Sequence, residues 1–189
     1  MRILFDIDDT LCGTSVEWTK ATYEYFDKLG IERNRPKSKD TYRLEESYNL
    51  TPQQKCDYFN TMNNSEFFAT MEPLPGAVVM MKQLARNHEI LLITARPIQL
   101  DDITNKWVSE KLGLDVDVHF VNDFPVWLKY QRIDVLIDNS VQRCLTAKEN
   151  GITSYLYCGS LVDGDIEQAN EIEKLYHYAD VIKKIKEMF

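Results

Sequence analysis

Apolar residues along this chain form short continuous runs in some places and recur at helical spacing in others. The runs at 3–5, 89–94 and 133–138 are rich in large aliphatic residues and predict buried strands. Residues 116–121 alternate acidic and apolar side chains, which predicts a half-exposed edge strand. A last short strand is predicted at 154–157. All of these segments except the first run follow residue 88.

Between the later runs, apolar residues recur every three or four positions, which is the spacing of a helix face. Helices are predicted at 77–85, 103–112 and 141–150, and the segment after residue 157 is predicted to be helical in one or two pieces. This alternation of strand and helix favours an α/β fold with a Rossmann-like parallel sheet and helices on both faces.

The long segment after the first strand has a different character. It shows no convincing strand pattern, and helices are predicted at 14–29 and 51–62, with a polar loop at 31–50 between them. We therefore expect a small helical cap inserted after the first strand. The expected division is a catalytic core at 1–13 and 75–189 and a helical cap at 14–74.

Charge and composition disfavour several classes of function. The formal net charge of −8 argues against binding to duplex nucleic acid, which requires a basic surface. No apolar stretch is long enough to span a bilayer and no secretory signal is recognisable, so we expect a cytoplasmic protein with no membrane partner. The sequence leaves open whether the chain forms a homodimer.

Motifs of other enzyme classes are missing from the sequence. The four cysteines show neither close pairing nor zinc-ligand spacing, which indicates reduced thiols. The three histidines form no His-x-x-x-His pair, which argues against a zinc hydrolase. The seven glycines are spread singly and form no phosphate-binding loop.

Polar side chains follow the three predicted buried strands. Asp6 and Asp8 follow the first, Thr94 ends the second, Asp138 ends the third, and Lys129 lies shortly before the third. The carboxyl ends of parallel strands meet at one edge of the sheet, where open α/β folds bind ligands. Each residue taken alone could be a strand-end cap. Together they supply the nucleophile, proton donor, metal ligands and cation that phosphoryl transfer needs.

The order and spacing of these residues resemble the four motifs of the haloacid-dehalogenase-like phosphohydrolases. The four motifs are Asp6-Ile7-Asp8-Asp9-Thr10-Leu11, Thr94, Lys129 and Ile137-Asp138-Asn139. Other stretches are similar to the 5'(3')-deoxyribonucleotidases and their bacterial and phage relatives. These are Ser65-Glu66-Phe67-Phe68, Glu72-Pro73-Leu74-Pro75-Gly76-Ala77, and Lys106-Trp107-Val108 before Leu112-Gly113.

The resemblance implies a role for each motif. Asp6 attacks phosphorus and forms an aspartyl-phosphate, while Asp8 protonates the leaving alcohol and later deprotonates the attacking water. Mg²⁺ is the implied cofactor, and its implied ligands are Asp6, the backbone carbonyl of Asp8, and Asp138 or Asn139. The implied phosphate-binding groups are Thr94, the backbone N–H groups of Ala95 and Arg96, and Lys129, which also pairs with Asp6.

Three departures from the family pattern bear on these roles. Asn139 stands where a second acid is usual, so the direct metal ligand is either Asp138 or Asn139. Arg96 stands in a stretch where the deoxyribonucleotidases have a small hydroxyl side chain and Pro. Lys129 is one residue nearer the fourth motif than expected, which leaves a plain surface lysine as the alternative.

The predicted cap is rich in aromatic residues, most of which we expect to form its core. In the deoxyribonucleotidases, cap aromatics stack on the base, and Phe67 and Phe68 lie in the matching stretch. The function hypothesis is a Mg²⁺-dependent phosphomonoesterase acting on a (deoxy)nucleoside monophosphate. Two alternatives stay open: a phosphatase of another small phosphate ester, and a non-catalytic phosphatase-like module that binds nucleotide or a partner protein.

Overall fold

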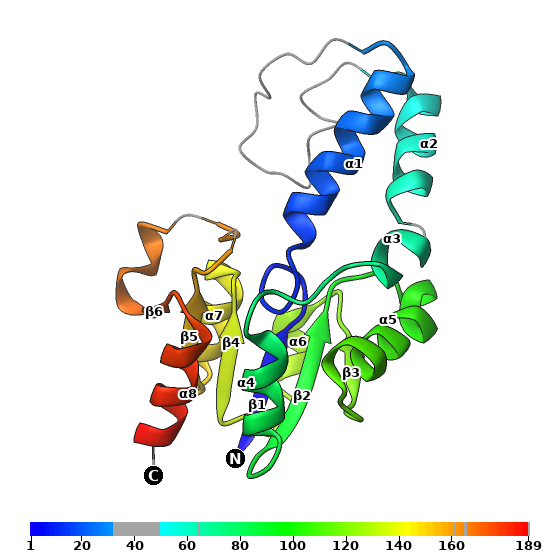
Figure 1. The fold of residues 1–189 in the computed structure, drawn as a ribbon. Coiled ribbons are helices and arrows are strands. Elements are labelled where there is room, and N and C mark those ends of the chain that lie inside the picture. Colours follow the sequence, from blue (N-terminus) through cyan, green and yellow to red (C-terminus); the bar gives the residue numbers. More distant parts are fainter. Residues whose placement is uncertain (32–49, 64, 161, 165, 189) are drawn as a thin grey trace. The chain divides into compact units, whose positions relative to one another are not determined.

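The chain forms two compact units, Met1–Gly13 with Glu72–Phe189 and Thr14–Met71. The structure is a computed structural model that describes residues 1–31, 50–63, 65–160, 162–164 and 166–188 (Figure 1). Most of the loop predicted at 31–50 therefore lies outside the described residues.

The larger unit contains a six-stranded, all-parallel sheet with the strand order β3-β2-β1-β4-β5-β6. Its strands are β1 (Arg2–Asp6), β2 (Glu89–Thr94), β3 (Val118–Phe120), β4 (Val135–Asp138), β5 (Thr153–Tyr157) and β6 (Glu173–Leu175). The predicted parallel α/β fold is confirmed. β1 lies between β2 and β4, with Phe5 in register with Leu92 and Ile137. The polar residues that end these three strands therefore lie at the same edge.

The prediction for the C-terminal segment was wrong in one respect, because β6 adds a further strand at the sheet edge beside β5. β6 has three residues, Glu173, Lys174 and Leu175, and two of them are charged. So short and polar a stretch has little strand preference of its own. Its pairing with β5 in the folded chain decides its conformation.

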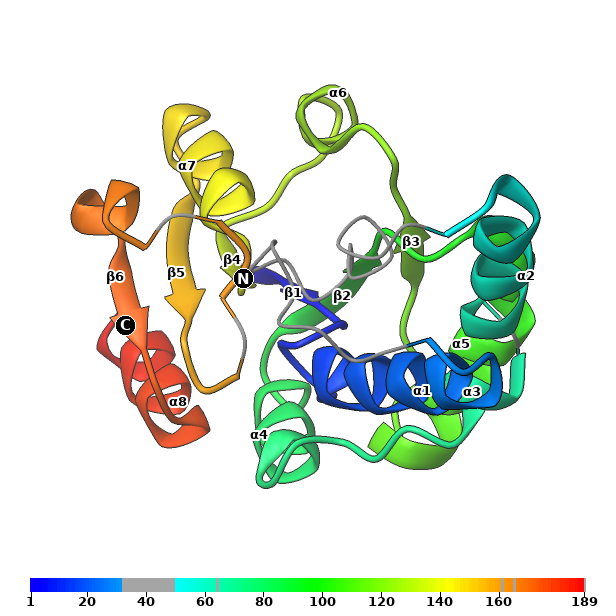
Figure 2. The same cartoon turned by 90° about the horizontal axis from the view of Figure 1, so that it is seen from above.

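Helices cover both faces of the sheet, as predicted. They are α4 (Ala77–Leu84), η2 (Ile98–Leu100), α5 (Asp101–Trp107), η3 (Val108–Leu112), α6 (Phe124–Leu128), α7 (Val141–Glu149), η4 (Gln168–Glu171) and α8 (Tyr178–Glu187). Figure 2 shows α4 and α8 on one face and α6 and α7 on the other. Gly113 ends η3 with a φ of +66°, a left-handed conformation that favours glycine. Among the described helices, none is both long and apolar enough to cross a membrane.

The central strand is buried on both of its sides. Ile3, Leu4 and Phe5 have no exposed surface, and Leu4 belongs to a core cluster that includes Leu136 of β4 and Ala147 of α7. Burial on both sides is the reason why this strand is a continuous apolar run in the sequence. Polar groups on this strand are consequently confined to its two ends, Arg2 at the amino end and Asp6 at the carboxyl end.

The smaller unit is helical in its described part. Its helices are α1 (Thr14–Lys28), α2 (Pro52–Met62) and α3 (Ser65–Ala69). Thr51 and Gln54 form a reciprocal capping box at the start of α2, where the sequence predicts that a helix begins. Tyr58 has no exposed surface, and its hydroxyl accepts a hydrogen bond of 2.9 Å from Nε1 of Trp18 on α1. The two rings also meet edge-on with centroids 6.4 Å apart, so this pair joins α1 to α2.

Candidate active site

The segment after β1 is a tight loop that begins at the first candidate carboxylate. Asp6 ends β1 and is 3% exposed. The carbonyl of Ile7 accepts hydrogen bonds from the N–H groups of Leu11 at 2.8 Å and Cys12 at 3.2 Å, which folds the loop back on itself. Asp9 adopts a left-handed conformation with φ of +57°, which a short polar side chain tolerates. The turn keeps Asp8 close to the strand end.

Two buried carboxylates share one cation. Nη1 of Arg143 donates to Oδ1 of Asp6 at 2.6 Å and to Oδ2 of Asp138 at 3.3 Å. The other oxygen of Asp138 accepts the backbone N–H of Ser140 at 2.8 Å. Ser140 caps α7, because its Oγ accepts the N–H of Arg143 at 3.4 Å. This cap places Arg143 in the first turn of α7, facing the ends of β1 and β4.

The shared cation opposes the cost of burying two acids side by side. Burial raises the pKa of Asp6 well above its usual range, the Asp138 carboxylate raises it further, and Arg143 lowers it. Burial also raises the pKa of Asp138, with Arg143 again opposing the shift. Burial alone lowers the pKa of Arg143, but Asp138 and Asp6 more than offset this and raise it. Arg143 therefore favours the ionised form that a nucleophilic Asp6 needs.

The sequence prediction assigned Lys129, and not Arg143, as the cation on Asp6. Lys129 is exposed at the C-terminal end of α6, and its predicted pairing with Asp6 is not formed in the structure. Sequence reasoning missed Arg143. The available signal was its spacing of five residues after Asp138, with the helix-capping Ser140 between them.

A second cation lies on Asp8. Nε of Arg96 donates to both oxygens of Asp8 at 3.1 Å, and Nη2 donates to Oδ1 at 2.8 Å. The Thr94 hydroxyl donates to Oδ2 of Asp8 at 3.0 Å and accepts the N–H of Arg96 at 3.1 Å. Thr94 and Arg96, which were predicted to hold phosphate, thus both contact Asp8. Ala95 is exposed, and the phosphate contact predicted for its backbone N–H stays a prediction.

The two polar residues of the fourth motif, Asp138 and Asn139, lie in different environments. Asp138 shares Arg143 with Asp6, as described above. Oδ1 of Asn139 instead accepts the Thr10 hydroxyl at 3.4 Å, and the Asn139 N–H donates to the same hydroxyl at 3.1 Å. Of the two candidate metal ligands, the structure groups Asp138 with Asp6 and ties Asn139 to the loop after β1.

The donor chemistry of Asp6 and Asp138 fits a Mg²⁺ ion. Mg²⁺ is commonly held by one or two carboxylates with water completing its octahedron. Asp6 Oδ1 and Asp138 Oδ2 both contact one nitrogen of Arg143, so an ion between these two oxygens would take the place of that nitrogen. Within the described ranges, no three His, Cys, Asp or Glu side chains are grouped so that they could hold a metal ion. Any Mg²⁺ site here therefore depends on two carboxylates, backbone oxygen and water.

The two candidate cap aromatics differ in exposure. Phe67 is half-buried, and its ring meets Trp18 edge-on with centroids 5.7 Å apart. Phe68 is 3% exposed. A ring so deeply buried offers no face for stacking on a base, so in this structure Phe68 is a packing residue. The prediction of base stacking stays with Phe67.

Comparison with known proteins identifies the family. Residues 1–156 match the family described as "5' nucleotidase, deoxy (Pyrimidine), cytosolic type C protein". The chain belongs to this family. A Bacillus cereus protein named "Putative nucleotidase" is 28% identical to this nucleotidase-family chain over 117 residues. That match covers 59% of each protein, which is less than two thirds of the relative's length.

Solved structures share the fold of this nucleotidase-family chain. A haloacid dehalogenase-like family hydrolase of Streptococcus pneumoniae has a TM-score of 0.70 at 13% identity, with 97% of each chain covered. A HAD family hydrolase of Deinococcus radiodurans with bound phosphate and sodium has a TM-score of 0.68 at 13% identity, covering 98% of this chain and 95% of that one. At such identities the likeness shows the fold alone.

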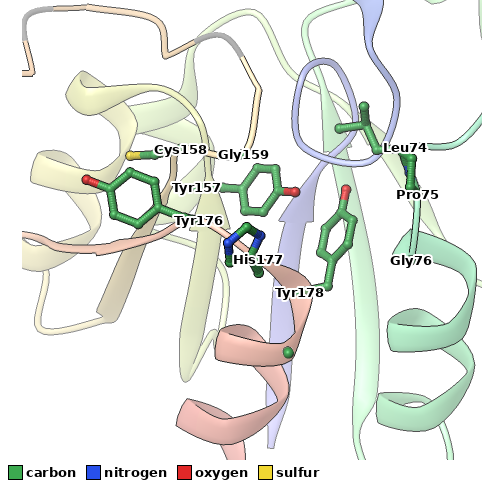
Figure 3. Close-up of a pocket in the computed structure, with 10 residues that line it drawn as sticks. Leu74, Pro75, Gly76, Tyr157, Cys158, Gly159, Tyr176, His177 and Tyr178 are labelled. Atoms are coloured by element: carbon green, nitrogen blue, oxygen red, sulfur yellow. The ribbon is translucent and has the colours of Figure 1, made fainter.

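A cavity of ≈740 Å³ in the larger unit lies beside the loop after β1 (Figure 3). It is lined by residues 74–76 just before α4, residues 157–159 at the end of β5, and residues 176–179 around the start of α8. The rings of Tyr157 and Tyr178 stack there with centroids 4.9 Å apart. The Tyr178 hydroxyl donates to the carbonyl of Thr10 at 2.7 Å. In this nucleotidase-family chain, the cavity wall thus supports the loop that contains Asp8.

We expect Arg143→Met to lower the free energy of unfolding by roughly 3–5 kcal/mol, because it leaves two buried carboxylates without their cation. Urea unfolding at neutral pH measures this loss. Arg86→Met makes the same replacement at an exposed arginine of the same unit and should change stability by less than about 0.5 kcal/mol. Equal, small losses in both variants would contradict the electrostatic role of Arg143.

Proposed function

We propose that this chain is a Mg²⁺-dependent phosphomonoesterase that releases phosphate from a (deoxy)nucleoside monophosphate. The observation that supports this most directly is the pairing of Asp6 with Asp138 through Arg143, next to Asp8, at the end of the central strand. Membership in the nucleotidase family and the name of the Bacillus cereus relative support the choice of substrate class.

In the proposed reaction, a carboxylate oxygen of Asp6 attacks phosphorus and the bond from phosphorus to the ester oxygen breaks. Asp8 gives its proton to that oxygen, so the product leaves as an alcohol. Asp8, now a carboxylate, removes a proton from the water that hydrolyses the aspartyl-phosphate. Asp6 is then restored as a carboxylate and inorganic phosphate departs.

Asp6, Asp138 and the backbone carbonyl of Asp8 are the residues that we propose to hold Mg²⁺. When bound, the ion neutralises charge on the phosphoryl oxygens and orients them. Arg143 opposes the effect of burial and favours the ionised form of Asp6, and the Ala95 N–H and Lys129 are proposed to contact phosphate oxygens. These groups reduce the repulsion between an anionic nucleophile and an anionic substrate.

A panel of phosphate esters tests this proposal. The wild type should release phosphate from nucleoside monophosphates in the presence of Mg²⁺, with Asp6→Asn as the blank. Higher kcat/KM for another class of ester would retain the mechanism and replace the substrate. Tight nucleotide binding without phosphate release at any Mg²⁺ concentration would favour a non-catalytic module.

We expect Phe67→Ala to raise KM for the preferred nucleoside monophosphate by about 5- to 150-fold, because stacking on a base is worth roughly 1–3 kcal/mol. KM for p-nitrophenyl phosphate, which has no base, should change little. Phe59→Ala is a matched control, because Phe59 is a partly exposed phenylalanine of the same helical unit. Equal changes in KM for both esters in Phe67→Ala would show that Phe67 only packs the unit.

We expect Asp138→Asn to weaken the apparent affinity for Mg²⁺ by at least ~10-fold, because it removes one of two carboxylate donors. Asn139→Asp should not tighten that affinity, since the Asn139 side chain faces Thr10. Titration of each variant with Mg²⁺, followed by calorimetry and by activity, measures both effects. Tighter Mg²⁺ binding by Asn139→Asp would show that residue 139 supplies the ligand.

A further inference from the structure

Arg96 is a buried cation that several elements of the larger unit hold in place. Its side chain is 2% exposed. Nη1 donates to Oγ1 of Thr104 at 3.4 Å, and the guanidinium lies over the ring of Trp107, 5.8 Å from the ring centroid. Nη2 also contacts the sulfur of Cys12 at 3.6 Å. Thr104 and Trp107 both belong to α5, so this helix fixes the plane of the guanidinium.

The fixed guanidinium in turn fixes Asp8. Nε and Nη2 are the two nitrogens that contact the Asp8 carboxylate, at 2.8–3.1 Å. A planar fork on a carboxylate defines direction as well as distance. The Thr94 hydroxyl contacts Oδ2 from β2. Asp8 sits on a loop, and these contacts anchor its carboxylate to a strand and a helix.

We propose that Arg96 is a positioning residue that aims the Asp8 carboxylate at the leaving oxygen of the substrate. This inference rests on the proposed function, in which Asp8 is the general acid and base. The alternative is that the Arg96 guanidinium binds phosphate directly. The geometry favours positioning, because each of the three guanidinium nitrogens already donates to a protein group and almost no surface of the side chain is exposed.

The two roles make different predictions for different leaving groups. An alkoxide leaves only with a proton, whereas p-nitrophenolate leaves without one. A misaimed Asp8 should therefore slow phosphoryl transfer from an alkyl ester far more than from an aryl ester. Loss of a phosphate contact should slow both equally, because both esters present the same phosphoryl group. The parameter kcat/KM isolates this first step from the later hydrolysis of the aspartyl-phosphate.

The test compares kcat/KM for a nucleoside 5'-monophosphate and for p-nitrophenyl phosphate in wild type, Arg96→Met, Arg96→Lys and Arg86→Met. We expect Arg96→Met to lose on the order of 10²-fold with the nucleotide and less than about 5-fold with the aryl ester. Arg96→Lys should recover part of the loss, because its single ammonium restores charge but not the fork. Arg86→Met should match the wild type. Equal losses with both esters in Arg96→Met would overturn the proposal.

A double-mutant cycle that combines Arg96→Met with Asp8→Asn is a second test of whether Arg96 acts through Asp8. If Arg96 acts through Asp8, Arg96→Met should cause no further loss of nucleotide kcat/KM in the Asp8→Asn background. A further loss of the same size there would show an independent role and overturn the proposal. If Asp8→Asn alone is as active as the wild type, the proposed function of Asp8 fails, which is a different result from failure of the positioning role.

A milder variant covers the case in which Arg96→Met does not fold, which urea unfolding and circular dichroism will show. Thr104→Val removes the hydroxyl that holds Nη1 and leaves the pair of Arg96 with Asp8 intact. We expect a loss of about 3- to 10-fold with the nucleotide, as for one hydrogen bond, and none with the aryl ester. A loss that is equal for the two esters, or none for either, would contradict positioning through α5.

Discussion

Asp6→Asn is expected to reduce phosphate release by on the order of 10⁴-fold or more, because an amide does not attack phosphorus and is a poor Mg²⁺ ligand. Single-turnover experiments with a ³²P-labelled ester should trap label on the wild-type protein and none on the variant. Asn has nearly the shape of Asp and its oxygen can still accept from Arg143, so the fold should persist.

The control for this prediction is Asp102→Asn, which removes an exposed carboxylate of the same unit. It should retain wild-type kcat and wild-type labelling. Phosphate release by Asp6→Asn within a factor of ten of the wild type would exclude Asp6 as the nucleophile, whatever the behaviour of the other variants.

Asp8→Asn is expected to lower kcat for a nucleoside monophosphate by roughly 10²- to 10⁴-fold, which is the range that general acid–base groups supply. The loss should include both half-reactions, because Asp8 acts first as acid and then as base. Rapid-quench kinetics separates them: formation of the labelled intermediate and its hydrolysis should both slow. If intermediate forms and decays at the wild-type rates, Asp8 has neither role.

Most of the core of the fold could be predicted from the sequence, because burial on both faces of a parallel sheet leaves a direct mark on it. The apolar runs at 3–5 and 89–94 and the helix start at Thr51 and Pro52 are local patterns with local causes. β6 was missed because its three residues become a strand only by pairing with β5. The same limit applied to α6, a five-residue helix with little periodicity.

The sequence indicated where the acids of the candidate site lie, but not which cations contact them. Carboxylates that directly follow a strand are fixed in space by that strand, so the sequence by itself determined that Asp6, Asp8 and Asp138 would meet at one edge. Long cationic side chains reach their partners from other elements, and their reach is not visible in spacing. Only the tertiary structure decided that Arg143 of α7, and not Lys129, pairs with Asp6.

The same distinction explains the second cation and the fourth motif. The sequence placed Arg96 beside the phosphate site through its position after Thr94, but the packing of α5 turns its guanidinium onto Asp8. The sequence also left Asp138 and Asn139 as equal candidates for the metal. Their separation required the Thr10 hydroxyl, which lies 129 residues away in the chain from Asn139 and within hydrogen-bond distance in space. The register of the parallel strands determined where the carboxylates of the candidate site lie. The packing of side chains from other elements decided which cations pair with them.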